Sequence, residues 1–203
     1  MSENYREIGP CTLLAPLPAV LVSCGFGGRQ NLLTVAWTGV VNSKPPMVSV
    51  SIKPERFSHD LIRDSGEFVV NLPGKEMLDA LDFCGVRSGR EKDKFAEAHL
   101  AAIPAVHLSQ APAVRGAAAS LSCKVRHMMP LGSHDLFIGE VTGIQVREDL
   151  FDPDGSLHLE RAELICYSHG LYQCSGEVLG FFGCSVARPE VRERRMLPYR
   201  SLK

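Results

Sequence analysis

The chain has 203 residues, of which 45% are hydrophobic and 22% charged, and its formal net charge at pH 7 is −1. This composition is typical of a folded globular protein and excludes a disordered chain. The balanced charge excludes general binding to nucleic acid or to a membrane surface through a polybasic face.

Five runs of strand-forming residues dominate the chain. They predict strands over 19–24, 31–41, 47–52, 121–128 and 136–146. The third run alternates cleanly, because serines separate Val48, Val50 and Ile52.

Three short helices are expected, over 54–64, 75–83 and 92–99. The first has its cap within 56–58 and is closed by Gly66, and the second stops at Gly85. Strands and helices do not alternate regularly, and no Gly-x-Gly-x-x-Gly follows a strand, so a Rossmann fold is not favoured. We therefore expect a mainly β protein with short helices, built as a mostly antiparallel barrel.

The N-terminal segment lacks the charged and then apolar arrangement of a secretory signal. No stretch approaches the ~20 apolar residues of a membrane helix, because Pro16, Pro18 and Gly25 interrupt the best candidate. We expect a cytoplasmic protein without membrane contact. We also expect one domain over 1–203, in which 188–203 forms a polar C-terminal extension.

Seven cysteines are scattered along the chain without a Cys-x-x-Cys pair. In a chain of this kind most of them are expected to be reduced, buried thiols. Cys166, His169 and Cys174 are spaced like part of a zinc site, but no fourth ligand is evident, and we expect no metal.

Two segments are candidates for ligand binding, one for a planar ligand and the other for a phosphate. The stretch 34–38 offers backbone groups and the flat ring of Trp37, although a tryptophan of this kind is also a common core residue. Arg56 and Ser58 stand where a helix begins, and free N–H groups at a helix start bind phosphate. An ordinary N-cap with an exposed arginine is the alternative.

Two further segments are less specific. The loop 87–95 is rich in Arg and Lys, and a solvated charged surface would explain it equally well. His134 stands at the mouth of a strand between small residues, where a surface histidine is the common alternative.

In this order along the chain, these segments resemble the flavin reductase-like, FMN-binding split-barrel family, and the flavoredoxin and ferric reductase branch is nearest. The resemblance is carried by Thr34-Val35-Ala36-Trp37, Lys44-Pro45-Pro46, Val48-Ser49-Val50-Ser51-Ile52, Arg56-Phe57-Ser58, Phe68-Val69-Val70-Asn71-Leu72-Pro73, the segment from Ser88 to Phe95, and Gly132-Ser133-His134 followed by Phe137-Ile138-Gly139-Glu140-Val141. One departure is Ser133, where many reductase members have aspartate.

The resemblance implies a Greek-key split barrel that forms a homodimer and binds FMN near the subunit interface. It implies that the cofactor is contacted by Thr34, Val35, Ala36, Trp37, Thr38, Ser51, Ile52, Lys53, Arg56, Ser58, Asn71 and Lys94. His134 would lie near the flavin face, where the nicotinamide of NADH or NADPH docks and delivers hydride to flavin N5.

The function expected from this resemblance is that of an NAD(P)H-dependent flavin reductase. One alternative is a flavoredoxin-type electron carrier, which keeps FMN bound and passes electrons to a redox partner protein. Another alternative is a binding module whose barrel holds haem or a deazaflavin.

Overall fold

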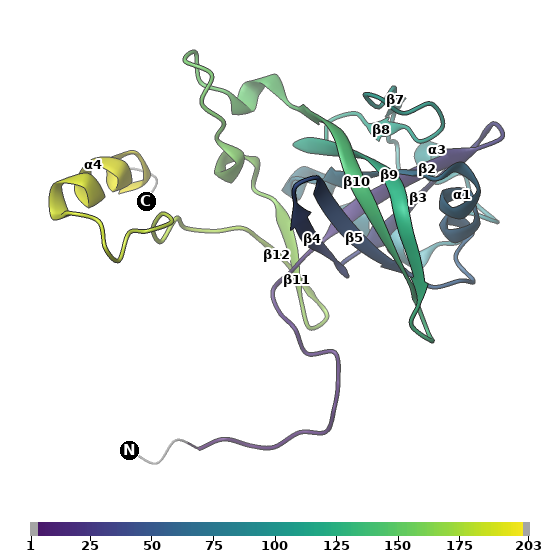
Figure 1. Ribbon diagram of the computed structural model, residues 1–203, viewed down its shortest axis with the longest axis horizontal. Coiled ribbons are helices and arrows are strands. Elements are labelled where there is room, and N and C mark those ends of the chain that lie inside the picture. The colour runs from purple at the N-terminus through teal and green to yellow at the C-terminus, as the bar shows by residue number, and fades with distance from the viewer. Residues whose placement is uncertain (1–3, 201–203) are drawn as a thin grey trace.

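A rolled sheet of seven antiparallel strands forms the centre of the molecule (Figure 1). The computed structural model describes residues 4–200. The order across the sheet is β3-β2-β6-β9-β10-β5-β4. The strands are β2 (Val20–Phe26), β3 (Arg29–Val35), β4 (Thr38–Ser43), β5 (Pro46–Ile52), β6 (Glu67–Leu72), β9 (Ala119–Pro130) and β10 (Asp135–Val146).

The sheet closes on itself at its two edge strands. Only Ala36 and Trp37 join edge strand β3 to edge strand β4, so the two edges of the sheet lie next to each other. The backbone N–H of Ser51 in β5 donates a hydrogen bond of 3.0 Å to the Trp37 carbonyl and ties the closure together. The expected mainly β barrel is confirmed.

Alternation along the strands separates the barrel interior from its outer face. Val48, Val50 and Ile52 of β5 are buried in the interior with the rings of Phe68 and Phe137, neither of which is exposed. Strand β2 is buried on both sides, since its alternate residues join either this interior or a second apolar cluster under the helices. This double burial explains why β2 is a continuous apolar run.

Three helices lie against β2 and β3. Helix α1 (Phe57–Ser65) connects β5 to β6, and α2 (Leu78–Val86) follows the 3₁₀ turn η1 (Lys75–Met77). Helix α3 (Lys94–Glu97) is a single turn. The second cluster packs α2 and α3 on the outer face of the sheet through Leu21, Leu32, Leu81, Cys84 and Phe95.

The remaining elements are short. They are the three-stranded sheet of β1 (Leu17–Pro18), β11 (Ile165–Ser168) and β12 (Leu171–Cys174), the pair β7 (Ala102–Ile103) and β8 (Ala113–Val114), the 3₁₀ turns η2 (Glu148–Leu150) and η3 (Leu159–Ala162), and helix α4 (Pro189–Arg200). The N-terminal segment and α4 both project away from the barrel (Figure 1). No helix among residues 4–200 is both long and apolar enough to cross a bilayer.

Two expectations about the elements are wrong. The single strand over 31–41 is two strands, because the chain turns at Ala36 and Trp37 to close the barrel. The second helix does not stop at Gly85 but runs through it to Val86. A Cβ at Gly85 would lie 3.3 Å from the Cβ of Thr34, so this glycine allows α2 to approach β3 closely.

Most of the cysteines are not deeply buried, contrary to expectation. Cys24, Cys84 and Cys123 are buried, and the other four are partly or fully exposed. The C-terminal extension expected over 188–203 contains helix α4. The single domain was expected over 1–203, of which residues 1–3 and 201–203 lie outside the described residues. The domain boundaries stay a prediction.

Candidate functional site

The start of α1 provides hydrogen-bond donors that no side chain of the helix cap takes up. After β5 the chain makes a turn in which the Arg56 N–H donates to the Lys53 carbonyl at 3.0 Å. Arg56 is the N-cap residue, with an extended backbone and no side-chain cap hydrogen bond. The first N–H groups of a helix have no partner inside the helix, so they are available to an anion.

Ser58, in the first turn of α1, is completely buried. Its Oγ accepts a hydrogen bond of 2.8 Å from Asn31 Nδ2 on β3. A hydroxyl is both acceptor and donor, so the Ser58 O–H can still donate to a bound group.

A cavity of about 220 Å³, here called the cationic cavity, opens between α1, β3 and the loop after α2. Its polar lining consists of Asn31, Arg56, Ser58, Arg87, Ser88 and Lys94, together with one carboxylate, Glu55, which is paired with Lys53 at 3.7 Å. Within residues 4–200, neither Arg56 nor Arg87 forms a side-chain ion pair or hydrogen bond. These guanidinium groups are therefore free to bind an anion.

Lys94 is a buried cation in this cavity, with 3% of its surface exposed. Its Nζ donates to the carbonyl oxygens of Leu32 at 2.8 Å and Cys84 at 2.7 Å. An ammonium has three N–H donors, and no third acceptor lies among the described residues. Burial lowers the pKa of Lys94, so a bound anion would compensate for its lost hydration.

A second cavity of about 370 Å³, here called the aromatic cavity, lies against the closure of the barrel. The backbone stretches 34–37 and 51–53 line it together with Leu33, Arg56, His134 and Tyr167. Its largest side chain is Trp37, which is 41% exposed, so the alternative of a core tryptophan is wrong. The ring centroids of Trp37 and His134 are 4.6 Å apart.

The two cavities adjoin each other, because Leu33 and Arg56 line both, and together they are here called the groove. One end carries cations and hydroxyl donors, and the other offers aromatic rings, apolar side chains and backbone groups. A ligand with a phosphate at one end and a flat ring at the other suits this arrangement.

Most of the expected site residues meet in this groove. Thr34, Val35, Ala36, Trp37, Ser51, Ile52, Lys53 and His134 line the aromatic cavity, Ser58 and Lys94 line the cationic cavity, and Arg56 lines both. The Thr34 hydroxyl donates to the Leu81 carbonyl, so the contribution of Thr34 to a ligand is limited to its backbone and methyl group.

Thr38 and Asn71 line neither cavity. The Thr38 hydroxyl donates to the Ser49 carbonyl at 2.7 Å within the β4–β5 pair. Asn71 is fully buried between strands, where its amide donates to Leu21 O and its Oδ1 accepts from the Val114 N–H, each at 2.9 Å. The fold itself uses both ends of the Asn71 amide, so the structure does not bring this side chain into the groove with the other expected residues.

Sequence reasoning did not single out Asn31 or Tyr167 as lining residues, and it gave Arg87 only as part of the basic loop 87–95. The only feature of the sequence that relates to Asn31 is the glycine at position 89 in the basic loop. A Cβ at Gly89 would lie 2.2 Å from Asn31 Oδ1, so a side chain at this position would clash with the asparagine. Tyr167 comes from β11, far along the chain from the segments 33–37 and 51–56 that line the same cavity, and no local pattern points to it.

A buried pair connects the two ends of the site. His59 follows Ser58 in the chain, and Asp135 follows His134. The distance between His59 Nε2 and Asp135 Oδ2 is 2.8 Å. The two residues are 4% and 8% exposed. The pair therefore fixes the start of β10, which directly follows His134, against α1.

Comparisons with known proteins agree with this geometry. The family model described as "Flavin reductase like domain" matches residues 14–173. The structure of flavoredoxin of Desulfovibrio vulgaris (Miyazaki F) has a TM-score of 0.84 and 27% identity, covering 91% of this chain and 100% of that chain. An FMN-binding protein from Thermus thermophilus, with bound 1-cyclohex-2-enone, has a TM-score of 0.71 and 28% identity, with coverages of 87% and 97%. "FMN reductase (NADH) RutF" of Stutzerimonas stutzeri (strain A1501) is 25% identical over 146 residues, which are 72% of this chain and 79% of the relative.

Proposed function

Because the chain belongs to the flavin reductase like domain family, we propose that it is an FMN-binding oxidoreductase, an NAD(P)H-dependent flavin reductase. The observation that carries this proposal is the pair of adjoining cavities, one cationic and one aromatic, that share Arg56. Similar proteins support it, since they include an FMN-binding protein and an FMN reductase that uses NADH.

The residues of the cationic cavity fit the phosphate of FMN. The Ser58 hydroxyl lines the cavity, Lys94 has an N–H without an acceptor among the described residues, and the guanidinium of Arg56 is without an ion-pair partner in residues 4–200. A phosphate dianion would satisfy all three donors, each through a charge-assisted hydrogen bond.

The flavin ring would lie in the aromatic cavity. The buried side chains of Val35 and Ile52 give this cavity an apolar floor, and the backbone groups of 34–37 and 51–53 can hydrogen-bond the polar edge of a ring. Lys53 Nζ lies 3.7 Å from Glu55 Oε1 and stays exposed, so the contribution of Lys53 is made through its backbone.

Bound FMN supplies the redox chemistry, because it accepts hydride from a nicotinamide and releases electrons to an acceptor. The protein has to bind, orient and shield the reacting rings, and no side chain has to act as acid or base. His134 is positioned for this task, since Ser133 Oγ lies 2.9 Å from its Nδ1 and Trp37 contacts its ring. We propose that His134 orients the nicotinamide of NADH or NADPH.

A second candidate function is a flavoredoxin-type electron carrier, favoured by the similarity to the Desulfovibrio flavoredoxin. The exposure of Trp37 is compatible with this alternative, because a redox partner protein could approach the ring end of the groove directly.

We further propose that the protein is a homodimer. Val40, Val41 and Ile144 are 79%, 50% and 56% exposed on the outer face of the barrel. Val40 and Ile144 line one apolar depression with Met47 and Leu121. Contiguous apolar surface of this kind is typical of protein interfaces.

The test is an absorption spectrum of the purified protein after incubation with FMN and gel filtration, followed by a steady-state assay of NADH and NADPH oxidation. A retained flavin band with turnover supports the reductase. A retained band without turnover supports the carrier. A haem or deazaflavin spectrum in the protein as purified, or failure of an FMN titration to reach saturation, would overturn the assignment of the groove to FMN.

A further inference from the structure

The amine of Lys94 has a geometry that phosphate binding alone does not require. Its Nζ donates to the backbone carbonyls of Leu32 at 2.8 Å and Cys84 at 2.7 Å. A tetrahedral nitrogen uses one position for its carbon and two for these hydrogen bonds. The fourth position has no acceptor among residues 4–200, and Lys94 lines the cationic cavity. This position is therefore the one left for a molecule in the cavity.

The same geometry suits a neutral amine. Without its third proton, Lys94 keeps both hydrogen bonds and has a lone pair at the fourth position. An ammonium is poorly solvated here, because Lys94 is only 3% exposed. Burial lowers the pKa of Lys94, and the positive charge of Arg56 lowers it further. A desolvated lysine beside another cation is a nucleophile that attacks carbonyl carbon.

The groups around Lys94 select an electrophile that carries a phosphate. Arg56 and Arg87 line the cavity without ion-pair partners in the described residues. Glu55, the one carboxylate among the lining residues, is paired with Lys53. The two guanidinium groups are therefore available for charge-assisted hydrogen bonds to a phosphoryl group. Because the cavity holds only about 220 Å³, the rest of the electrophile has to be small.

We propose that, in the protein without bound FMN, Lys94 is a modification site that reacts with small acyl phosphates such as acetyl phosphate. The lone pair of the neutral amine forms a bond to the acyl carbon, and the bond from this carbon to the phosphate oxygen breaks. The phosphate leaves with the bonding electron pair and takes up the amine proton. The products are an acyl-lysine and inorganic phosphate. A phosphoryl group held in the cavity keeps the acyl carbon close to the amine, which accelerates the reaction.

Acylation of Lys94 switches off the phosphate end of the groove. An acyl-lysine has no charge and a single N–H, whereas the ammonium has three N–H donors. We expect the acylated protein to bind FMN about tenfold or more weakly, because a hydrogen bond from a charged donor is lost. Riboflavin, which has no phosphate, should bind as before. This consequence rests on the proposed function, whereas the acylation itself requires only that the cavity binds phosphate.

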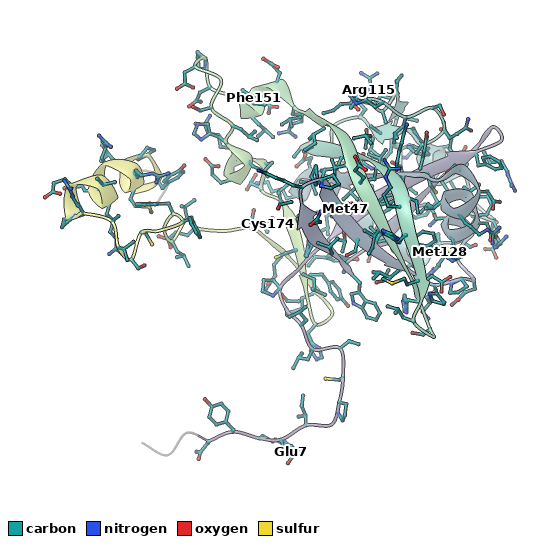
Figure 2. All side chains as sticks on the ribbon, viewed as in Figure 1. Glu7, Met47, Arg115, Met128, Phe151 and Cys174 are labelled. Atoms are coloured by element: carbon teal, nitrogen blue, oxygen red, sulfur yellow. The ribbon has the colours of Figure 1, made fainter. Side chains whose placement is uncertain are left out.

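The test compares two reagents that transfer the same acetyl group. The full chain, dialysed free of flavin, is incubated with acetyl phosphate or with acetic anhydride, which has no phosphate. Peptide mass spectrometry follows the acetylation of each lysine. Lys44 and Lys124 are internal controls, because both are exposed and have no side-chain partner in the described residues. Lys124 is on β9, the strand that carries Met128 in Figure 2.

The measured quantity is the rate of acetylation of Lys94 divided by that of Lys124. We expect this ratio to be about tenfold or more higher with acetyl phosphate than with acetic anhydride, because only the first reagent is held in the cavity. Dividing the two ratios cancels the burial of Lys94 and its intrinsic reactivity. Inorganic phosphate and FMN should each protect Lys94 from acetyl phosphate and leave the rate at Lys124 unchanged.

Arg56→Ala tests whether the phosphate directs the reagent. This variant should reduce the preference of Lys94 for acetyl phosphate over acetic anhydride by about tenfold, since a charge-assisted hydrogen bond to the phosphoryl group is lost. Arg115→Ala is the matched control and should keep the wild-type preference. Arg115, labelled in Figure 2, is exposed, lines neither cavity and has no side-chain partner in the described residues.

The remaining outcomes separate this inference from the proposed function. Equal ratios with the two reagents would overturn the inference, as would failure of inorganic phosphate to protect Lys94. A protein that binds FMN but is not acetylated at Lys94 by acetyl phosphate would overturn this inference alone. Phosphate-protected acetylation of Lys94 in a protein that does not bind FMN would overturn the proposed function and support this inference.

Discussion

Replacing Arg56 with alanine tests the phosphate end of the groove directly. Arg56 lines both cavities and has no ion-pair partner in residues 4–200, so its removal leaves no protein carboxylate unpaired. The variant therefore reports a ligand contact rather than damage to the fold. A hydrogen bond to a charged group contributes about 1.5–3 kcal/mol, which corresponds to roughly a 10- to 150-fold increase in the Kd for FMN.

The assay compares FMN with riboflavin, which has the same ring and no phosphate. Titration followed by Trp37 fluorescence should show the full loss for FMN in Arg56→Ala and an unchanged Kd for riboflavin. Arg115→Ala, which removes the same charge elsewhere, should bind both as wild type does. Equal weakening of FMN and riboflavin would refute the reasoning, because it would mean that Arg56 contacts the ring and not the phosphate.

Three further variants test the supports of the site and the core. Gly89→Ala should weaken FMN binding in the same titration, because its Cβ would lie 2.2 Å from Asn31 Oδ1 and displace the amide from Ser58; an unchanged Kd would contradict this. His59→Phe should lower the free energy of unfolding by about 1–3 kcal/mol in urea, since it leaves the buried Asp135 carboxylate without its partner, and wild-type stability would disprove the role of the pair. Burial raises the pKa of Cys123 from 9.0 to about 12, so above pH 9 the unfolded chain loses a thiol proton that the folded chain keeps. Between pH 8 and pH 10 wild type should therefore lose about 1.4 kcal/mol more stability than Cys123→Ala, and parallel pH curves for the two would exclude this linkage.

The parts of the site that are local in sequence could be predicted. Arg56 and Ser58 were found because a strand, a turn and a helix start follow one another within a few residues. Trp37 was found because its flat ring lies in a strand-forming run, and His134 because it stands at the mouth of the strand-forming run 136–146. In these cases the backbone pattern alone fixes where the side chain lies.

The parts that depend on the closure of the barrel could not be predicted. Residues 31–41 are all compatible with one strand, and the break at Ala36 arises only because β4 pairs with β5 on the opposite edge. Gly85 indicates a helix end when only the local sequence is considered. In the structure it lies inside α2 and allows the helix to approach Thr34 on strand β3 closely. Asn71 belongs to a recognisable motif, but its amide is taken up by β2 and by the segment around β8, which no local pattern reveals.

The arrangement of the groove separates affinity from reactivity. The cations and hydroxyl donors lie at the cationic end, where Ser58 and Lys94 are 0% and 3% exposed, and buried charge-assisted hydrogen bonds are strong. The ring end is different, because Trp37 is 41% exposed there and a second molecule can reach the surface of a bound ring. A reductase and an electron carrier can therefore share the same phosphate site and differ only in what approaches the ring end. It follows that measuring FMN affinity tests the site, whereas the nature of the electron donor has to be tested at Trp37 and His134.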